Sequence, residues 1–302
     1  LFDTIIEQVK GYPDLTREPL QFQISSLGYD DYIGRLGIGR IEKGSIYGGQ
    51  TVAVVGPGGE SRLHKIGQTF VYKGLRRAEE KAVFCGDICV VAGIDGITIG
   101  DTICDEAHPL KLPSIKIEEP TMSMNFIVNT SPFAGLEGKY VTTRHIKERL
   151  EKEIEVNVGL LVEPTGSSDA FKVSGRGELH LSILIENMRR EGYELSVSKP
   201  EVIFKKDARG QKTEPVEEVV IEVPEKYAGG VISELNLRKG IMRSMDGKNG
   251  HSRLVYTAPT RGLLGFRSLF INQTRGEGTM VRRFYAYEKY KGKINERASG
   301  VI

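Results

Sequence analysis

The longest stretch without a helical pattern constrains the fold most. From Leu20 to Pro113 the sequence consists of short runs of strand-forming residues separated by glycine turns. These runs are Leu20–Ser25, Ile33–Glu42, Thr51–Val55, Leu63–Val71, Ile88–Ala92 and Thr102–Cys104. Several short strands at such regular spacing are typical of a closed all-β structure. We therefore expect an antiparallel β-barrel over residues 19–113.

The glycine-rich segment Gly34–Arg40 lies inside this stretch. It reads Gly-Arg-Leu-Gly-Ile-Gly-Arg and opens no helix, so it cannot place a phosphate at a helix N-terminus. Glycines within a barrel strand usually allow a bulge or a corner, and this is the interpretation that we favour. Arg35 and Arg40 remain candidates for facing outward onto a phosphate.

After Pro113 the pattern changes to an alternation of strands and helices. In the first expected helix, Ile146 and Leu150 recur at helical spacing, and Thr142 or Thr143 can cap its start. The expected strands are 121–128, 158–163, 170–174 and a last one from 193 onward, and the expected helices are 141–156 and a second around 181–188. The order β-α-β-β-α-β predicts a ferredoxin-like domain over residues 114–206.

Residues 216–287 repeat this order. The expected elements are a strand at 216–223, a helix at 228–238, a hairpin of 241–245 and 252–257, a helix at 263–272 and a strand at 279–287. They predict a second ferredoxin-like domain over residues 207–290. The predicted fold class is therefore multi-domain, β and α+β, with an antiparallel β-barrel followed by two ferredoxin-like βαββαβ domains.

Both ends of the sequence look like cuts through a longer protein. Residues 1–18 hold one short amphipathic turn followed by Gly11 and Pro13, which indicates a linker. The sequence starts on Leu1 without an initiator Met and stops on the apolar pair Val301-Ile302. Residues 291–302 therefore begin a segment that the sequence does not finish.

The charge distribution is uneven although the net charge is only +2. From Arg261 to Ile302 there are nine Lys/Arg against three Glu and no Asp, a local charge of +6, so the rest of the chain carries −4. A basic end on an acidic body suggests a polyanionic partner.

The three cysteines and five histidines form no recognisable metal or catalytic cluster. Cys85, Cys89 and Cys104 lie among apolar residues, which indicates buried, reduced thiols of a cytosolic protein. His180 lies between two leucines and is better explained as a packed or surface residue. The sequence shows no signal peptide and no membrane span, so we expect a cytoplasmic protein without a membrane partner.

No segment has the pattern of a phosphate-binding loop. The pattern GxxxxGK[ST] supplies backbone amides and a lysine to the nucleotide phosphates. Gly138-Lys139, Gly247-Lys248 and Gly292-Lys293 lack both the upstream Gly and the following Ser or Thr. The hydrolase patterns GxSxG and HExxH are absent as well. We expect no catalytic, cofactor-binding or metal-binding residue, and no enzyme activity of this chain by itself.

The most specific stretch is Val173–Leu181, which reads Val-Ser-Gly-Arg-Gly-Glu-Leu-His-Leu. Gly175 and Gly177 turn the chain from strand into helix, for which we expect a positive φ or a close backbone approach. Glu178 in the first helical turn complements the helix dipole. Arg176 is turned outward at this corner and is a candidate for contact with a partner.

This stretch, in a βαββαβ unit after a barrel, resembles the third domain of elongation-factor-G-like translational GTPases. The segments Glu119–Met124, Asn129–Arg144 and Pro259–Arg267 are similar to the BipA/TypA branch of that family. The resemblance covers essentially the whole chain. It implies a barrel like the family's second domain, then its third and fifth domains, and at 291–302 the start of a BipA-specific C-terminal domain.

The resemblance also implies what lies outside this chain. The family's GTPase domain, with GTP and Mg²⁺, would precede Leu1, so residues 1–18 would be the linker from that missing domain. In the family, the GTP-bound protein docks at the factor site between the ribosomal subunits. The implied partner is the bacterial ribosome, both its RNA and its proteins, with a monomer serving translation, ribosome assembly or stress adaptation.

The basic C-terminal stretch supplies most of the candidate RNA contacts. Its cations are interleaved with Phe284, Tyr285 and Tyr287, and arginine beside aromatic rings suits phosphate contact and base stacking. The candidates are Arg176, Arg261, Arg267, Arg275, Arg282, Arg283, Lys291 and Lys293, with Lys289 beside them. The alternative is a solvated face whose aromatic residues belong to the core.

Two other functions stay open. One is a fragment of an elongation factor G or of a tetracycline-protection-type factor. The other, of a different class, is a metabolic enzyme whose ferredoxin-like units are small-ligand sensor domains. The segments similar to BipA disfavour the first, and the lack of a catalytic cluster disfavours the second.

Overall fold

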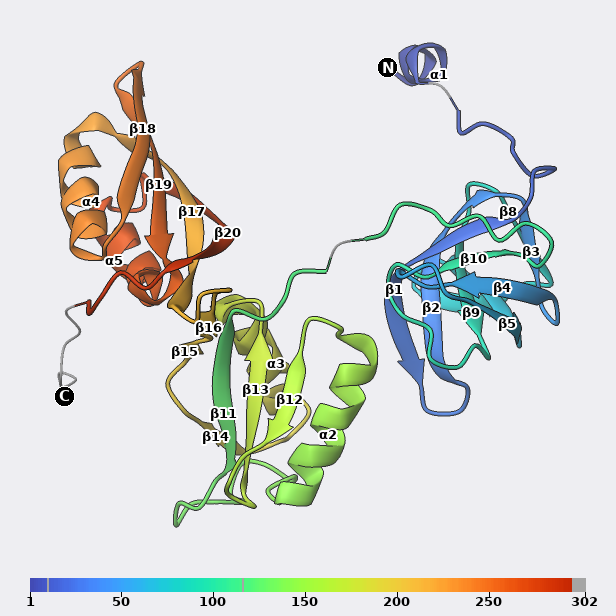
Figure 1. Ribbon diagram of the computed structural model, residues 1–302, viewed down its shortest axis with the longest axis horizontal. Coiled ribbons are helices and arrows are strands. Elements are labelled where there is room, and N and C mark those ends of the chain that lie inside the picture. Colours follow the sequence, from blue (N-terminus) through green and yellow to red (C-terminus); the bar gives the residue numbers. More distant parts are fainter. Residues whose placement is uncertain (10, 116, 295–302) are drawn as a thin grey trace. The chain divides into compact units, whose positions relative to one another are not determined.

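The computed structural model describes residues 1–9, 11–115 and 117–294. The chain divides into two compact units (Figure 1). The N-terminal unit comprises Leu1–Glu118 together with Thr142–Val162. The C-terminal unit comprises Glu119–Val141 together with Glu163–Ile302.

An antiparallel sheet dominates the N-terminal unit (Figure 1). Its elements are α1 (Phe2–Gln8), β1 (Gln21–Asp30), β2 (Gly34–Lys43), β3 (Ser45–Tyr47), β4 (Thr51–Val55), β5 (Ser61–Lys65), β6 (Thr69–Lys73), β7 (Arg76–Glu79), β8 (Ala82–Phe84), β9 (Ile88–Ala92) and β10 (Thr102–Asp105). Eight strands pair in the order β5-β4-β10-β1-β2-β9-β6-β7, and β3 pairs with β8. The short strands expected between Leu20 and Pro113 are present, and no helix interrupts them within the described part of that stretch.

Alternation along the strands places one face of this sheet in the core. Phe22 and Ile24 on β1 are fully buried and the alternating Gln21 and Gln23 are not, because successive side chains of a strand point to opposite faces. The pairing of β1 with β2 shifts register between Ile24 and Ser26, next to Gly39. A Cβ at Gly39 would lie 1.9 Å from the Gln23 carbonyl oxygen. Gly39 thus lies beside a bulge, at a position where the backbone of β1 leaves no room for a side chain.

The helix α2 (Thr143–Val156) groups with the N-terminal unit. Thr142 caps it, since its side chain accepts a hydrogen bond from the His145 N–H. The helix contacts β1, and Glu155 forms an ion pair of 2.6 Å with Arg35. The Arg35 guanidinium also donates to the Ile97 carbonyl, 3.1 Å away. Arg35 is therefore engaged within the protein and does not face a free phosphate site.

The first sheet of the C-terminal unit is built around β11 (Met122–Val128). The other elements are β12 (Leu161–Pro164), β13 (Ala170–Gly175), α3 (Glu178–Arg190), β14 (Leu195–Val197) and β15 (Glu201–Val202). The strands pair in the order β12-β13-β11-β14, and β15 also pairs with β11. With α2, the elements follow one another along the chain in the predicted order β-α-β-β-α-β.

The corner between β13 and α3 gives its two glycines different roles. A Cβ at Gly175 would lie 3.0 Å from both the His180 Nδ1 and the Leu181 Cδ2, so the expected close approach is present there. Gly177 has φ 174° and ψ 177°, an extended conformation that any residue adopts, and nothing lies within 4 Å of a Cβ built on it. The expectation that Gly177 needs to be glycine was wrong, because the chain turns with open space around this position. Glu178 lies in the first turn of α3, as expected.

The second sheet of the C-terminal unit is centred on β17 (Lys212–Pro224). Its other elements are β16 (Lys205–Lys206), α4 (Glu225–Leu237), β18 (Ile241–Lys248), β19 (His251–Pro259), the 3₁₀ helix η1 (Thr260–Leu263), α5 (Phe266–Gln273) and β20 (Thr279–Lys289). The strands pair in the order β16-β17-β19-β18, and β20 pairs with β17 (Figure 1). The single helix expected at 263–272 is instead two, because Gly265 has a left-handed φ of 69° between η1 and α5.

One face of this second sheet is buried under its helices. Val219, Ile221 and Val223 alternate along β17 and pack in one cluster with Val231 of α4 and Phe270 of α5. The other face of β17 carries the intervening Glu218, Val220 and Glu222, which are not buried. The sheet therefore presents one face and its edges to solvent.

At this corner the same substitution should destabilise the fold at Gly175 but leave it nearly unchanged at Gly177. Gly175→Ser places a Cβ against the buried Leu181, and we expect it to lower the free energy of unfolding by about 1–3 kcal/mol. Gly177→Ser introduces a good N-cap residue into open space, so the change should stay within about 0.5 kcal/mol. Urea unfolding measures both variants. An equal loss in the two would contradict this description of the corner.

Candidate nucleic-acid interface

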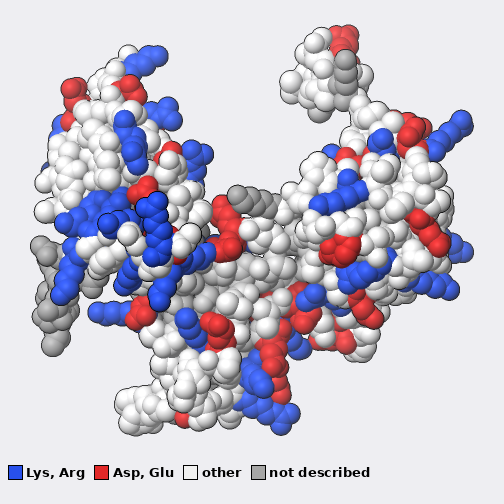
Figure 2. Space-filling view, viewed as in Figure 1, with Lys and Arg blue, Asp and Glu red and all other residues white. Residues whose placement is uncertain are grey.

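The candidate cations lie mainly on the second sheet of the C-terminal unit. Figure 2 shows Lys and Arg gathered on the left of the view, over the part of this module where β20 ends. The candidates differ in what their side chains contact. Some form ion pairs within the protein, and others reach solvent without such a partner among the described residues.

Glu214 on β17 is the buried carboxylate of this module, with 0% of its surface exposed. It accepts hydrogen bonds from the Nε and Nη2 of Arg261 and, at 2.7 Å, from the backbone N–H of Lys291. The Arg261 guanidinium also donates to the Gly292 carbonyl. Only 11% of the Arg261 side chain is exposed. The donors of Arg261 are used inside the protein, which disfavours the predicted contact with RNA.

Aromatic rings complete the environment of this pair. The Arg261 guanidinium carbon lies 4.7 Å from the centre of the Tyr290 ring. The Lys212 ammonium lies between two rings, 3.6 Å from the centre of Phe204 and 4.7 Å from that of Tyr290. Cations over aromatic faces are attracted by the ring quadrupole. These rings are therefore occupied by the protein's own cations.

Two more candidates are largely internal. The Lys291 ammonium lies 3.0 Å from the Glu288 carboxylate, and its side chain is mostly buried. Arg282 donates to both oxygens of Glu217, at 2.8 and 3.0 Å, and to the Leu263 carbonyl at 3.4 Å. These internal contacts disfavour the predicted RNA contacts of Lys291 and Arg282.

Arg283 has an intermediate position. Its Nε donates to the Glu218 carboxylate at 2.6 Å, and this hydrogen bond raises the pKa of the guanidinium. The side chain is nevertheless 73% exposed. Exposed ion pairs contribute little to stability, so exchange of Glu218 for a phosphate would cost the fold little.

The other candidates are exposed, and none of them has an ion-pair partner among the described residues. They are Arg176 at the corner before α3, Arg267 on α5, Arg275 after α5, and Lys289 and Lys293 at and beyond the end of β20. Arg275 has a positive φ of 53° directly after the helix. The fold brings four of the five to one module, whereas Arg176 belongs to the other sheet of the unit.

The aromatic residues of β20 separate in the same way. Tyr285 is exposed, whereas burial raises the pKa of Tyr287 to about 12 and the Lys205 ammonium lies 4.4 Å from the centre of its ring. A stacking platform needs an open ring face. Tyr285 provides such a face. Tyr287 does not, because its ring is packed within the protein.

Sequence reasoning missed the basic residues of the β18–β19 hairpin. Arg243 and Lys248 lie on the edge strand β18, which is exposed along its whole length, and Arg253 lies on β19. Arg243 donates to the Thr257 hydroxyl at 3.0 Å, and Arg253 pairs with Glu222 at 3.7 Å. These residues precede the C-terminal basic stretch in sequence, so a count along the chain could not group them with it.

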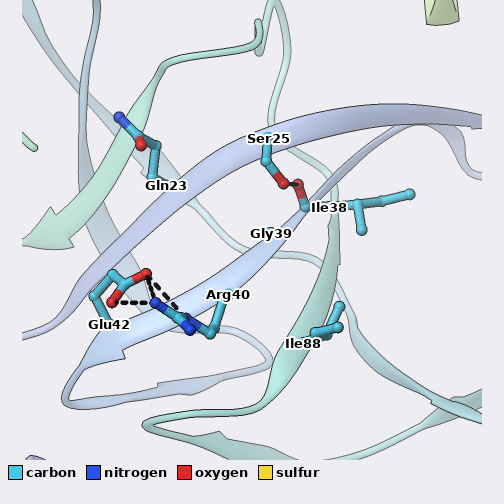
Figure 3. Close-up of a pocket in the computed structure, with 7 residues that line it drawn as sticks. All are labelled: Gln23, Ser25, Ile38, Gly39, Arg40, Glu42 and Ile88. Carbon is cyan, nitrogen blue, oxygen red and sulfur yellow. Dashed lines mark hydrogen bonds and ion pairs between the residues drawn. The ribbon is translucent and has the colours of Figure 1, made fainter. Parts of the chain in front are cut away.

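A shallow pocket on the N-terminal unit offers no alternative site (Figure 3). It is lined by Gln23, Ser25, Ile38, Gly39, Arg40, Glu42 and Ile88. Arg40 and Glu42 point toward each other in it, and Glu42 also accepts a hydrogen bond of 2.7 Å from the Tyr12 hydroxyl. The Glu42 carboxylate thus occupies the donors of Arg40, so this pocket gives no support to the prediction that Arg40 faces a phosphate.

The cysteines and His180 are packed into the structure. Burial raises the pKa of Cys89 to about 12 and that of Cys104 to about 11, and Cys85 is half-buried. His180 accepts a hydrogen bond from the Arg176 N–H at 3.3 Å. In the part of the chain that the structure describes, no group of three His, Cys, Asp or Glu could hold a metal ion. None of the described helices is both long enough and apolar enough to span a bilayer.

Two families match parts of this chain. Residues 211–298 match the family described as "Elongation factor G C-terminus", which covers the module of β17 to β20. Residues 34–104 match "Elongation factor Tu domain 2", which lies within the strands β2 to β10.

Several curated proteins are similar to this chain over its whole length, and all carry the name "Large ribosomal subunit assembly factor BipA". The chain is 48% identical to the protein from Bacillus subtilis (strain 168), 50% to that from Haemophilus influenzae and 46% to that from Escherichia coli (strain K12). Each alignment covers 100% of this chain and 49% or 50% of the relative. The chain thus spans about half the length of the curated relatives it matches.

A solved structure of a protein from Thermus thermophilus shares the fold. The match has a TM-score of 0.59 and covers 96% of this chain and 58% of that protein. Its sequence identity is 14%, so this likeness concerns the fold alone. Identity near one half over the whole length of the chain is the stronger finding, and the two elongation-factor matches agree with it. The chain belongs to the BipA family of elongation-factor-like proteins.

Proposed function

We propose that this chain is the ribosome-binding portion of a translational GTPase that acts in assembly of the large ribosomal subunit. The observation that carries the proposal is the set of exposed cations on the C-terminal module, in a chain about half identical to large ribosomal subunit assembly factors. Ribosomal RNA is a polyanion, and phosphate contacts by Lys and Arg dominate such affinities.

The proposed RNA surface comprises the exposed cations Arg267, Arg275, Lys289 and Lys293 and the exposed Tyr285 of the same module. Each cation reaches solvent, so each can meet a phosphate without breaking an internal pair. Tyr285 adds a ring face for stacking on an unpaired base. Arg283 joins the surface if a phosphate replaces Glu218, and Arg176 is proposed as a separate contact on the other sheet of the unit.

The modules are proposed to be those of the elongation-factor family. The N-terminal strands would close into a barrel over residues 19–113, and two ferredoxin-like domains would follow over 114–206 and 207–290. The sheet order β12-β13-β11-β14 supports the first of these domains. Counted within the unit, it is second, third, first and fourth strand, which is the strand order of a ferredoxin-like sheet. Residues 1–18 would be a linker and 291–302 the start of a further domain.

The activity of the whole protein is also a proposal. GTP and Mg²⁺ would bind a domain outside this chain, and hydrolysis would change the affinity for the ribosome. The chain itself would act as a cytoplasmic, monomeric binding module. The elongation factor G and tetracycline-protection alternatives are disfavoured by the identity to BipA proteins. A screen of metabolites by thermal shift would test the small-ligand sensor alternative.

The salt dependence of ribosome binding tests the proposed surface. Each phosphate contact adds roughly 0.7–0.9 to the slope of log affinity against log salt. The triple variant Arg267→Gln, Arg275→Asn and Lys289→Gln should therefore flatten this slope by about 2–3 in binding to purified ribosomes. The control removes the same charge from the N-terminal unit, with Lys65, Lys73 and Lys81 changed to Gln, and should leave the slope unchanged. Equal slopes for the triple variant and the unmodified chain would place the RNA surface elsewhere.

Arg261 should behave differently from the surface cations. Arg261→Gln leaves the buried Glu214 carboxylate without its main partner, so we expect a loss of about 3–5 kcal/mol in the free energy of unfolding. At a temperature where the variant stays folded, its salt slope should match that of the unmodified chain. A flattened slope at unchanged stability would show that Arg261 contacts RNA after all.

We expect no guanine nucleotide to bind this chain. No segment has the spacing of Gly and Lys that a phosphate-binding loop needs. Titration with a fluorescent GTP analogue should give no saturable signal. Saturation in the micromolar range would contradict the placement of the nucleotide site outside the chain.

A further inference from the structure

The segment Asn129–Tyr140 joins β11 to α2 and projects from the first sheet of the C-terminal unit (Figure 1). Its tip exposes two large apolar side chains, Phe133 at 71% and Leu136 at 74%. Isolated exposed apolar residues are common, but two such residues on one projecting loop form a local apolar surface. We refer to residues 129–140 as the apolar loop.

A single carboxylate fixes the shape of the apolar loop. Glu194 accepts hydrogen bonds from the Asn129 side-chain amide at 2.5 Å and from the N–H groups of Gly135 and Gly138, each at 3.1 Å. The Gly138 N–H contributes most to lowering the pKa of the Glu194 carboxyl, and Asn129 and Gly135 add to it. The carboxylate thus binds the start, the middle and the end of the loop at once.

The base of the loop is held as firmly. The Lys139 and Tyr140 N–H groups both donate to the Gly192 carbonyl, at 2.8 and 3.1 Å, and the Tyr140 ring centre lies 4.7 Å from that of Tyr193. A Cβ at Gly138 would lie 2.6 Å from the Glu194 Cβ, so the chain passes too close to Glu194 for any other residue.

Turns inside the loop set the direction of its tip. The Ala134 N–H donates to the Ser131 carbonyl at 3.0 Å, and Gly135 has a left-handed φ of 84°. None of these contacts uses the side chains of Phe133 or Leu136. The loop therefore holds its shape without burying its two largest apolar groups, and it would lose little conformational entropy on binding a partner.

The charge of the loop indicates the class of partner. The apolar loop contains one acidic residue, Glu137, and one cation, Lys139, which lies at its base, and the side chain that holds its shape is the Glu194 carboxylate. The tip is correspondingly white in Figure 2, in contrast to the basic C-terminal module. A phosphate backbone at the tip would meet no cation of residues 129–138, because Lys139 lies at the base of the loop and Arg189, whose charge acts on Glu137, lies on α3. An apolar pocket of a protein would bury both Phe133 and Leu136.

We propose that Phe133 and Leu136 insert into an apolar pocket of a ribosomal protein, as a second contact independent of the RNA surface. This inference rests on the proposed ribosome binding. The apolar contact would be insensitive to salt, because no counterion is released when it forms. The chain would thus recognise RNA and protein through different modules.

Paired substitutions test the contact in the full chain. The double variant Phe133→Ser and Leu136→Ser should bind purified large ribosomal subunits about tenfold more weakly or worse, with an unchanged salt slope. Leu179→Ser is the matched control, because Leu179 on α3 is 73% exposed in the same unit and should not change the affinity. Glu194→Gln keeps both apolar side chains but weakens the hydrogen bonds that hold the loop, so we expect a smaller loss of affinity.

A cross-link identifies the class of partner. With p-benzoylphenylalanine in place of Phe133, irradiation of the complex should join the chain to a ribosomal protein. A cross-link to ribosomal RNA alone would overturn the inference, and so would unchanged affinity of the double variant. If the unmodified chain does not sediment with ribosomes, the proposed function itself fails and the ribosomal partner of the loop with it. Binding of the unmodified chain and the double variant with equal affinity overturns the loop contact only.

Discussion

The buried carboxylate of Glu214 is the constraint on which the C-terminal module depends. An ionised carboxylate without compensation costs several kcal/mol in a protein interior, on the order of the whole stability of a domain. Arg261 and the Lys291 N–H supply the compensation, and Arg261 also holds the Gly292 carbonyl. One charge therefore ties together β17, η1 and the segment after β20. Because Lys291 and Gly292 are held in this way, the same contacts also position the adjacent Lys293, which is exposed.

Much of the fold was predictable because it depends on local periodicity. Alternating apolar residues indicated the strands, and the spacing of Ile146 and Leu150 indicated α2 with its cap. The predictions failed where the structure depends on the backbone conformation or the surroundings of a single residue. A positive φ at Gly265 divides an expected helix in two, and open space around Gly177 removes the need for glycine there. Neither property leaves a trace in hydrophobic periodicity.

The candidate site was less predictable because its charges are matched between distant segments. A count along the sequence found a row of cations, but Glu214, Glu217 and Glu218 on β17 neutralise three of them across the sheet. These acids lie 47 and 65 residues from their partners. Only the pairing of β17 with β20 and the position of η1 bring them together. The clamp of Glu194 on the apolar loop is hidden from the sequence for the same reason.

The strands β18 and β20 form the two edges of the second sheet, and the charges on them have a further consequence. An edge strand offers unpaired backbone groups on which a strand of another molecule can add, and charged side chains are a common protection against such aggregation. Arg283 and Lys289 on β20, and Arg243 and Lys248 on β18, place like charges in the path of an approaching copy. Cations suited to a polyanion thus also keep free molecules apart. If the proposed RNA contacts hold, the same side chains serve both recognition and protection of the sheet edges.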